Sequence, residues 1–280
     1  GLLRADPPMG VPRPALSDAV LAKATERRVL FVTKANSRSS VHRPVHLDYV
    51  GVKTFGPDGQ ITGERRILGL FTASAYAESV GRVPYLREKV AAVMRKAGFQ
   101  DESHSSKDLL GILEDYPRDE LFQADVDQLV DVGTSVLTLA QKRRARVFLR
   151  PDDYGRFVSA LVYIPRDRYT TAVRLRVEGI LREALHAKSI DYTARVSESP
   201  LARVHYVARL EPGAEMPDID IDLLNDKIGA AIRTWDEDFR DAAIRGVGEE
   251  AAAPLVAAYG PAFSISYKDD FEVAQGLADL

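Results

Sequence analysis

The residues best suited to chemistry in this sequence are arginines that gather around two strand-rich segments. A planar guanidinium group binds a carboxylate through two parallel hydrogen bonds, so it suits either a small-molecule site or an ion pair between domains. The candidate contact residues are Arg43, Arg65, Arg66, Arg156, Arg166 and Arg174.

Three roles are open to these arginines. We favour ion pairs with acidic side chains of the same protein, and the candidate partners are Asp119, Glu120, Asp152 and Asp167. An amino-acid effector site would use the same guanidinium groups together with backbone amides of an adjacent turn. The third role is contact with another part of a larger polypeptide.

The sequence patterns of common catalytic sites are absent. No G-x-G-x-x-G follows a strand, and no G-x-x-x-x-G-K-[ST], H-E-x-x-H or G-x-S-x-G occurs. A dinucleotide needs backbone amides of a glycine-rich turn at a helix N-terminus to receive its pyrophosphate. We therefore predict no catalytic residue and no cofactor in this segment, which by itself is expected to be non-catalytic.

Metal binding is not favoured either. His42 and His46 are four residues apart, but Pro44 between them argues against the helix that this spacing would require. The run Asp218–Asp222 has an acidic residue at every second position, yet it lacks the glycine and the distal glutamate of a calcium loop. We interpret it as an acidic helix N-terminus and predict no metal site.

The composition of the chain bears on which partners and which cellular compartment we expect. The net charge is −3, so no basic field indicates a nucleic-acid partner. No apolar run approaches the ~20 residues of a membrane span, and no membrane partner is expected. The absence of cysteine fits a reducing cytoplasm. The chain starts at Gly1 without methionine and ends within a helical pattern, so we expect a piece of a longer polypeptide.

The first part of the chain predicts a linker and an antiparallel β unit. Residues 1–27 are a proline-rich linker with a short helix capped by Ser17. Residues 28–83 hold three β-rich runs, of which the last two are joined by a turn at Asp58–Gly59. On the strand that starts at His46, we expect Asp48 and Lys53 to face water.

Residues 84–144 predict a connector of three helices that packs on the sheets. The first follows Pro84 and ends at Gly98, and the second is capped by Ser106 and ended by Pro117. The third is expected to run without a break from about Glu120 to Arg143.

Residues 145–247 predict an α+β domain with the order β-β-α-β-β-α. The segment Phe157–Ile164 is apolar at nearly every position, as is typical of a central strand covered on both faces. Thr170 or Thr171 caps the first helix, and an aspartate caps a long second helix from Pro217 to about Arg245. We expect these elements to form a four-stranded, mainly antiparallel sheet with both helices on one face, which is a ferredoxin-like architecture. Residues 248–280 are expected to form a helical tail.

Several long strings in this sequence resemble one enzyme family. SSVHRP, LDYVGVKTF, GERRILGLFTASAY, VPYLREKV, YPRDELFQ, RPDDYGRFVSALVYIPRDRYTT and SPLARVHY span residues 39–206 in the order expected for the large bacterial NAD-specific glutamate dehydrogenases. In that family the N-terminal half carries ACT-like domains and helical motifs, and the dehydrogenase domain follows. The resemblance implies oxidation of L-glutamate to 2-oxoglutarate and ammonia with NAD, by a catalytic part that this sequence lacks.

These observations favour a regulatory or scaffolding segment of such an enzyme. Its expected partners are the catalytic part of the same polypeptide and further copies of itself in a homo-oligomer. Two alternatives stay open: an ACT-like module that binds an amino-acid effector, and a purely architectural oligomerisation segment.

Overall fold

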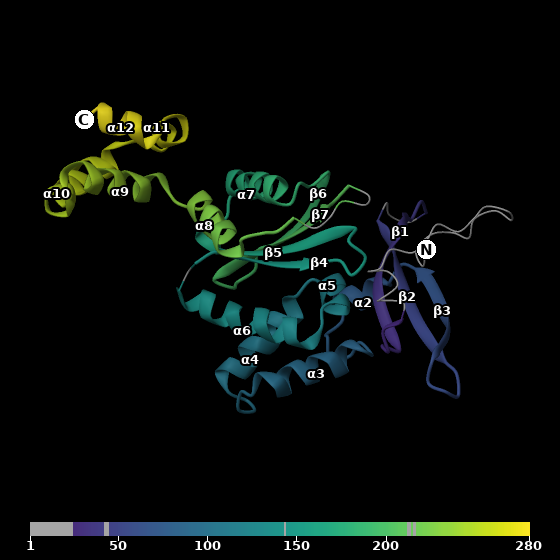
Figure 1. The fold of residues 1–280 in the computed structure, drawn as a ribbon. Coiled ribbons are helices and arrows are strands. Elements are labelled where there is room, and N and C mark those ends of the chain that lie inside the picture. Colours follow the sequence, from purple (N-terminus) through teal and green to yellow (C-terminus); the bar gives the residue numbers. More distant parts are fainter. Residues whose placement is uncertain (1–24, 42–44, 143, 212–213, 215–216) are drawn as a thin grey trace.

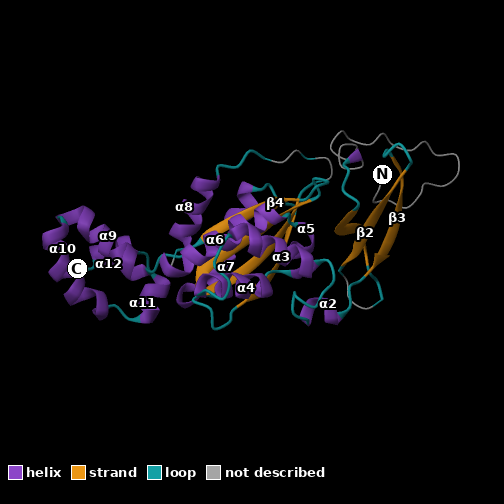
Figure 2. Ribbon diagram, turned by 90° about the horizontal axis from the view of Figure 1, so that it is seen from below, coloured by secondary structure: helices purple, strands orange, loops and turns teal. Residues whose placement is uncertain are grey.

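The computed structural model describes residues 25–41, 45–142, 144–211, 214 and 217–280 (Figure 1). The helix expected at Ser17 lies outside these residues. The described parts follow one another in a row: a three-stranded sheet, a four-stranded sheet with helices, and a group of C-terminal helices (Figure 2).

The first sheet is antiparallel and has the order β1-β2-β3, with β1 at Leu30–Arg38, β2 at His46–Phe55 and β3 at Ile61–Gly69. Gly59 has a φ of 73° in the turn between β2 and β3, a conformation that suits glycine. The short helix α2, Ala73–Ala77, leads out of the sheet.

Two polar side chains of β2 are buried, so the prediction that they face water is wrong. Asp48 is 4% exposed and Lys53 is 5% exposed. Asp48 accepts a hydrogen bond from the backbone N–H of Phe71 at 2.7 Å, and Lys53 donates to the carbonyl oxygen of Glu26. Segments outside the strand cover both residues, and the strand pattern does not report on such segments.

Four helices follow: α3 at Leu86–Ala97, α4 at His104–Asp115, α5 at Arg118–Gln123 and α6 at Val126–Lys142. The predicted single helix from Glu120 to Arg143 is therefore divided. The backbone N–H of Gln128 donates to the Asp125 carboxylate at 2.8 Å, and this side-chain bond starts α6 anew. The cap of α4 is Ser103, whose hydroxyl accepts from the N–H of Ser106, the residue predicted as the cap.

The second sheet is antiparallel throughout, with the order β4-β5-β7-β6. Its strands are β4 at Arg146–Pro151, β5 at Phe157–Pro165, β6 at Ser189–Arg195 and β7 at Leu201–Arg209. The 3-10 turn η1, Arg166–Arg168, and the helix α7, Thr171–Ala184, connect β5 to β6, and β7 lies between these two strands. After β7, the helix α8, Ile221–Ala231, returns to β4, where Asn225 accepts a hydrogen bond from the N–H of Val147 at 2.9 Å. This is a ferredoxin/ACT-like unit, as predicted.

Helices cover both faces of this sheet. Val158, Ala160, Val162 and Ile164 of β5 share a core with α7 and α8. Leu161 and Tyr163 point the other way, into a core formed with α3, α4, α5 and α6. Figure 1 shows α7 and α8 on one side of the sheet and α3, α4 and α6 on the other. Every residue of β5 is buried, which confirms the prediction of a doubly covered central strand.

Caps on the helices of this unit agree with the sequence. The Thr170 hydroxyl accepts from the N–H of Val173 at 3.1 Å at the start of α7. The Asp220 carboxylate accepts from the N–H groups of Asp222 and Leu223, each at 3.0 Å, at the start of α8. The acidic run at 218–222 is therefore a helix N-terminus, as interpreted.

The long helix predicted from Pro217 to Arg245 is wrong, because the chain turns between α8 and α9. Thr234 and Glu237 form a capping box that starts α9 at Trp235–Val247. The helices α10 at Glu249–Tyr259, α11 at Ile265–Asp270 and α12 at Val273–Ala278 follow, with the 3-10 turn η2 at Gly260–Ala262 between α10 and α11.

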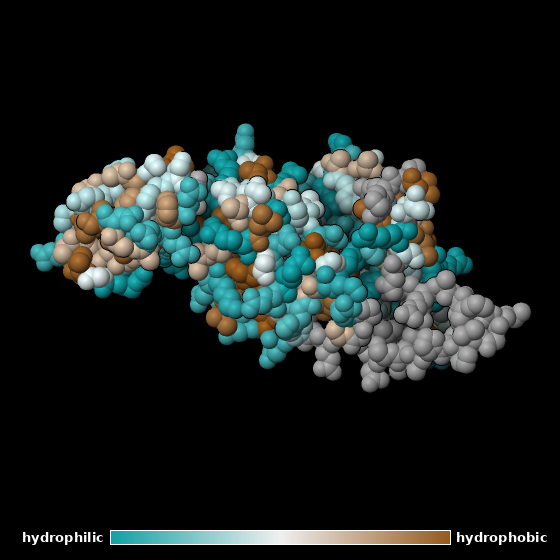
Figure 3. Space-filling view, turned by 90° about the horizontal axis from the view of Figure 1, so that it is seen from above, coloured by the Kyte–Doolittle hydropathy of each residue, from teal (hydrophilic) through white to brown (hydrophobic). Residues whose placement is uncertain are grey.

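An aromatic cluster holds the C-terminal helices together. The ring of Trp235 stacks on Phe239 at 5.1 Å between centroids and contacts Phe263 at 4.9 Å. The Trp235 indole donates to the carbonyl oxygen of Phe271 at 2.9 Å. Hydrophobic side chains also reach the surface of this group in the space-filling view (Figure 3), and Tyr259 is 46% exposed.

None of the helices in the described ranges is long and apolar enough to cross a membrane.

Substitution of Gly276 by alanine tests this packing. A methyl group there would lie 2.7 Å from Cζ2 of Trp235, so we expect Gly276→Ala to lower the free energy of unfolding by about 1–3 kcal/mol. At Gly246 in α9 no atom lies within 4 Å of the added methyl group, and Gly246→Ala should be neutral or stabilise by about 0.5–1 kcal/mol. Urea denaturation followed by tryptophan fluorescence measures both; equal stability of Gly276→Ala and the parent would contradict the packing.

Candidate functional site

Arg156 joins the two sheets. Its guanidinium binds the Asp152 carboxylate through Nε at 2.7 Å and Nη2 at 2.8 Å. It also donates to the Thr33 hydroxyl at 3.0 Å and to the carbonyl oxygen of Lys34, both on β1. Asp152 is 4% exposed and accepts further bonds from the N–H groups of Tyr154 and Arg156. The turn between β4 and β5 therefore holds Arg156 rigidly against β1.

A second contact between the first sheet and the helices is built around Lys34. Its ammonium group lies 2.6 Å from Asp48 and 3.0 Å from Asp119, and the Tyr76 hydroxyl donates to Asp119 at 2.9 Å. Burial by itself would lower the pKa of Lys34, but the carboxylates of Asp119 and Asp48 hold it above its ordinary value. This charged cluster links β1 and β2 to α2 and α5.

The other predicted contact residues lie on separate elements. Arg174 on α7 pairs with Glu178 at 2.9 Å, and its guanidinium lies 4.0 Å from the ring centroid of Tyr192. Arg166 is exposed and donates to the Ser197 carbonyl at 3.1 Å. On β3, Arg66 lies 3.5 Å from Glu64 and Arg65 is exposed. Arg43 is outside the described residues, as is His42, while His46 contacts the Ala35 carbonyl at 3.0 Å.

A deeply buried ion pair involves an arginine outside the predicted set. Arg150 on β4 binds both carboxylate oxygens of Glu120 on α5, each at 2.7 Å. Glu120 is 4% exposed. Burial would raise the pKa of Glu120, but the charge of Arg150 and hydrogen bonds with His205 and Arg150 hold it well below its usual range. The sequence had suggested Glu120 as an acidic partner; Arg150 carried no signal beyond its place at the end of a strand.

Ser159, His205 and Glu120 have the residue types of a catalytic triad, but their geometry does not fit one. The Ser159 hydroxyl lies 2.9 Å from His205 Nε2, and Glu120 Oε1 lies 3.7 Å from that same nitrogen. A triad places the serine and the carboxylate on opposite ring nitrogens, so that the base is oriented by one and acts on the other. Ser159 is also 2% exposed, and Glu120 is held by Arg150. We interpret the group as a structural network.

Lys89 fixes the helix that carries Glu120. It is 8% exposed, and its ammonium group donates to three carbonyl oxygens at the end of α5: those of Leu121 at 3.0 Å, Phe122 at 2.9 Å and Ala124 at 2.8 Å. A lysine at a helix C-terminus satisfies carbonyls that have no partner within the helix. Burial lowers the pKa of Lys89 to about 7, and the charge of Arg28 acts in the same direction.

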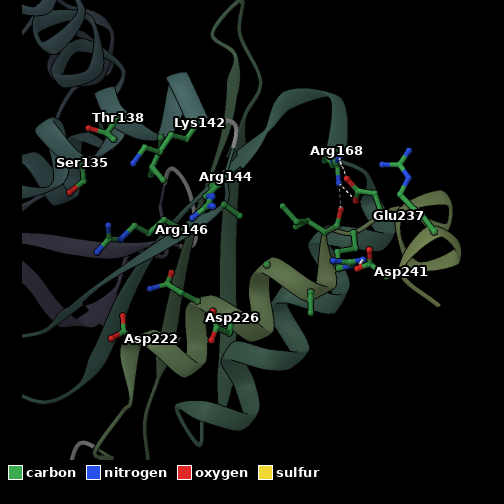
Figure 4. Close-up of a pocket in the computed structure, with 18 residues that line it drawn as sticks. Ser135, Thr138, Lys142, Arg144, Arg146, Arg168, Asp222, Asp226, Glu237 and Asp241 are labelled. Atoms are coloured by element: carbon green, nitrogen blue, oxygen red, sulfur yellow. Dashed lines mark hydrogen bonds and ion pairs between the residues drawn. The ribbon is translucent and has the colours of Figure 1, made fainter. Parts of the chain in front are cut away.

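An open groove lies where α6, β4, α8 and α9 meet (Figure 4). Its volume is about 1090 Å³. Arg168 closes one end by binding both carboxylate oxygens of Glu237 at 2.5 Å, and this pair ties η1 to α9. Arg233 binds Asp238 and Asp241 beside it.

The groove has opposite charges on facing walls. Lys142, Arg144 and Arg146 extend from the end of α6 and the start of β4, and Asp222 and Asp226 lie on α8 across from them (Figure 4). Such walls suit a small molecule that carries both a carboxylate and an ammonium group. Within the described ranges, no three His, Asp or Glu side chains are grouped so that they could hold a metal ion.

Three family models match successive parts of the chain. They are glutamate dehydrogenase helical motif 1 at residues 83–142, the ACT2 domain at 146–236 and helical motif 2 at 242–280. The first range covers α3 to α6, the second covers the four-stranded sheet with α7 and α8, and the third covers α10 to α12 with part of α9.

The names of three similar proteins agree with these family models. The chain is 40% identical over 253 residues to the NAD-specific glutamate dehydrogenase of Halomonas elongata and 37% identical over 265 residues to that of Pseudomonas aeruginosa. It is 33% identical over 284 residues to that of Mycobacterium tuberculosis. These matches cover 90%, 95% and 96% of this chain but only 16% of each relative.

Removal of Arg150 should be costly. Arg150→Met leaves the Glu120 carboxylate buried without its cation, and we expect a loss of about 3–5 kcal/mol in the free energy of unfolding. Adding Glu120→Gln to this variant should restore most of the loss, because no uncompensated charge is then buried. Lys188→Met removes an ion pair whose partners are both 59% exposed and should change stability by less than about 0.5 kcal/mol. Denaturant titration of the parent and the three variants measures these changes in stability. A small loss of stability in Arg150→Met would contradict the assignment of Arg150 as the essential cation beside Glu120.

Arg156→Lys should loosen the first sheet. Lysine keeps the charge but cannot form the paired bonds to Asp152 and reach Thr33 as well. We expect amide hydrogen exchange in β1 to become roughly tenfold faster while exchange in α6 stays unchanged. Arg166→Lys is the control, because the guanidinium of Arg166 is exposed and its hydrogen bond goes to the Ser197 carbonyl, outside the first sheet. Uniform acceleration in both variants would show that Arg156 has no particular role.

Proposed function

We propose that this chain, which belongs to the ACT2 and helical-motif region of the NAD-specific glutamate dehydrogenase family, is a regulatory and scaffolding segment of such an enzyme. Oxidation of L-glutamate to 2-oxoglutarate and ammonia with NAD is then the work of a catalytic part of the same polypeptide. The 16% coverage of the relatives leaves ample length for that part. The cysteine-free sequence is consistent with an enzyme of the cytoplasm.

The observation that carries the proposal is the cover on both faces of the ACT-like sheet. One face packs on α7 and α8, and the other packs on the helices of the first helical motif. Charged side chains cross the boundaries: Glu120 binds Arg150 and Arg156 reaches β1 in buried surroundings, and the partly exposed Arg168 binds Glu237. A segment joined in this way acts as a stiff body, because breaking either of the buried contacts leaves an unpaired charge in the interior.

Stiffness of this kind suits a role in transmitting a domain movement. Coupling between distant sites requires elements that move as units and have discrete arrangements. In our proposal the C-terminal helices, which Arg168 ties to the sheet, pass such a movement to the rest of the polypeptide. A homo-oligomer would provide the second surface against which the segment moves.

The oppositely charged groove supports a second candidate function, an amino-acid effector site. Lys142, Arg144 and Arg146 are available for a carboxylate, and Asp222 and Asp226 for an ammonium group. Arg156 and Arg174, which the sequence offered for this role, are occupied by Asp152 and Glu178. Arg144 is therefore the better residue to vary. The third candidate, pure architecture, predicts the same assembly with no ligand.

Calorimetric titration of the chain with amino acids, 2-oxoglutarate and NAD, together with light scattering for mass, tests these functions. For the scaffold we expect a defined oligomer and no heat from NAD. An amino acid that binds below about 1 mM, with affinity lost in Arg144→Ala, would establish the effector role. Tight NAD binding, or a monomer without any ligand, would overturn both the scaffold and the effector proposals.

A further inference from the structure

Two arginines lie side by side on the face of the ACT-like sheet that the first helical motif covers. Arg203 on β7 is the direct cross-strand partner of Arg195 on β6 and of Tyr163 on β5. Directly paired residues of antiparallel strands project from the same face, and Tyr163 belongs to the core shared with α4 and α6. Like charges in this position destabilise a sheet unless other groups neutralise them.

The carboxylate next to these two arginines forms its ion pair with Arg195. Asp115 at the end of α4 lies 2.6 Å from Arg195 Nη2. Among the described residues, the guanidinium of Arg203 donates a hydrogen bond only to the backbone carbonyl oxygen of Asp115. Its Nε is buried and has no hydrogen-bond partner among the described residues. Burial lowers the pKa of Arg203 and the charge of Arg195 acts in the same direction, while Tyr163 and Asp115 oppose this shift without cancelling it.

Arg203 lines a cavity of about 820 Å³ between α4, α6 and the turn from β6 to β7. Ser197 and Ser199 of that turn also line it, and each hydroxyl oxygen accepts a backbone N–H, which leaves its own proton for another acceptor. Asp108 and Glu198 lie at the exposed rim. The partly buried guanidinium of Arg203 and the hydroxyl groups of the turn are donors, and the Asp115 carboxylate is already paired with Arg195, so the cavity matches an oxyanion.

We propose that this cavity binds a small molecule through a carboxylate or phosphate group placed against Arg203. Such an anion neutralises the second guanidinium. Because the cavity is bounded by α4 and α6 on one side and by the sheet on the other, the bound anion holds the first helical motif against the ACT2 domain. The site is separate from the groove beside α8, and its existence does not depend on the function proposed above.

Thermal unfolding of the chain in inorganic phosphate or in succinate tests the site, with sodium chloride at matched ionic strength as reference. We expect ~10 mM of a binding anion to raise the Tm by roughly 2–4 °C. Arg203→Gln keeps a donor for the Asp115 carbonyl but removes the charge; it should lose this shift and, without anion, melt no lower than the parent. Arg65→Ala, at an exposed position on β3, should retain the shift.

Arg203→Lys provides a second test that does not depend on the folding of the glutamine variant. It keeps the charge but not the planar fork, and calorimetry should show affinity weakened about tenfold. A shift with phosphate alone identifies a phosphate ligand, and a shift with succinate alone identifies a carboxylate. No shift with either anion, or an equal shift in Arg203→Gln, overturns the proposal.

Discussion

Burial of the strand β5 on both faces is the constraint on which the rest of this structure depends. Alternate side chains of one nine-residue strand enter two different cores, so neither helical layer can be moved without exposing the other side of the same sheet. Each layer buries apolar area that stabilises the unit by roughly 25 cal/mol per Å² removed from water. The order β4-β5-β7-β6 follows, because the strand with apolar residues on both faces must lie inside the sheet and the more exposed β6 at its edge.

Charged side chains are used at the boundaries between the parts. Glu120 meets Arg150 between helices and sheet, Arg156 reaches β1 of the first sheet, and Arg168 meets Glu237 at the C-terminal helices. The buried pairs among them add little net stability compared with apolar packing, but they tolerate only one arrangement. We therefore see them as the features that fix how the parts are oriented. Two cavities lie at the same boundaries, where a bound ligand would alter that orientation.

The match to three glutamate dehydrogenase models gives these boundaries a functional meaning. Helical motif 1 and the ACT2 domain share one core, and helical motif 2 is joined to them through the α8–α9 turn and an ion pair. The chain spans only 16% of the length of each relative, and its role within a whole enzyme is the subject of the function proposed above. Whether it senses a ligand depends on the cavities rather than on the fold, since folds of this kind serve many functions.

The sequence by itself determined the elements whose signals are local. The apolar run of β5 predicted a doubly covered strand, and Thr170 and an aspartate predicted the starts of α7 and α8, because periodicity and caps act within a few residues. It missed the breaks before α6 and α9, where no glycine or proline interrupts the helical pattern and a side-chain cap alone restarts the helix. Tertiary structure alone decided the burial of Asp48 and Lys53 and the partners of Arg150, Arg156 and Arg203. These depend on which distant segment covers a strand, and strand alternation reports the face of a residue but not what lies above it.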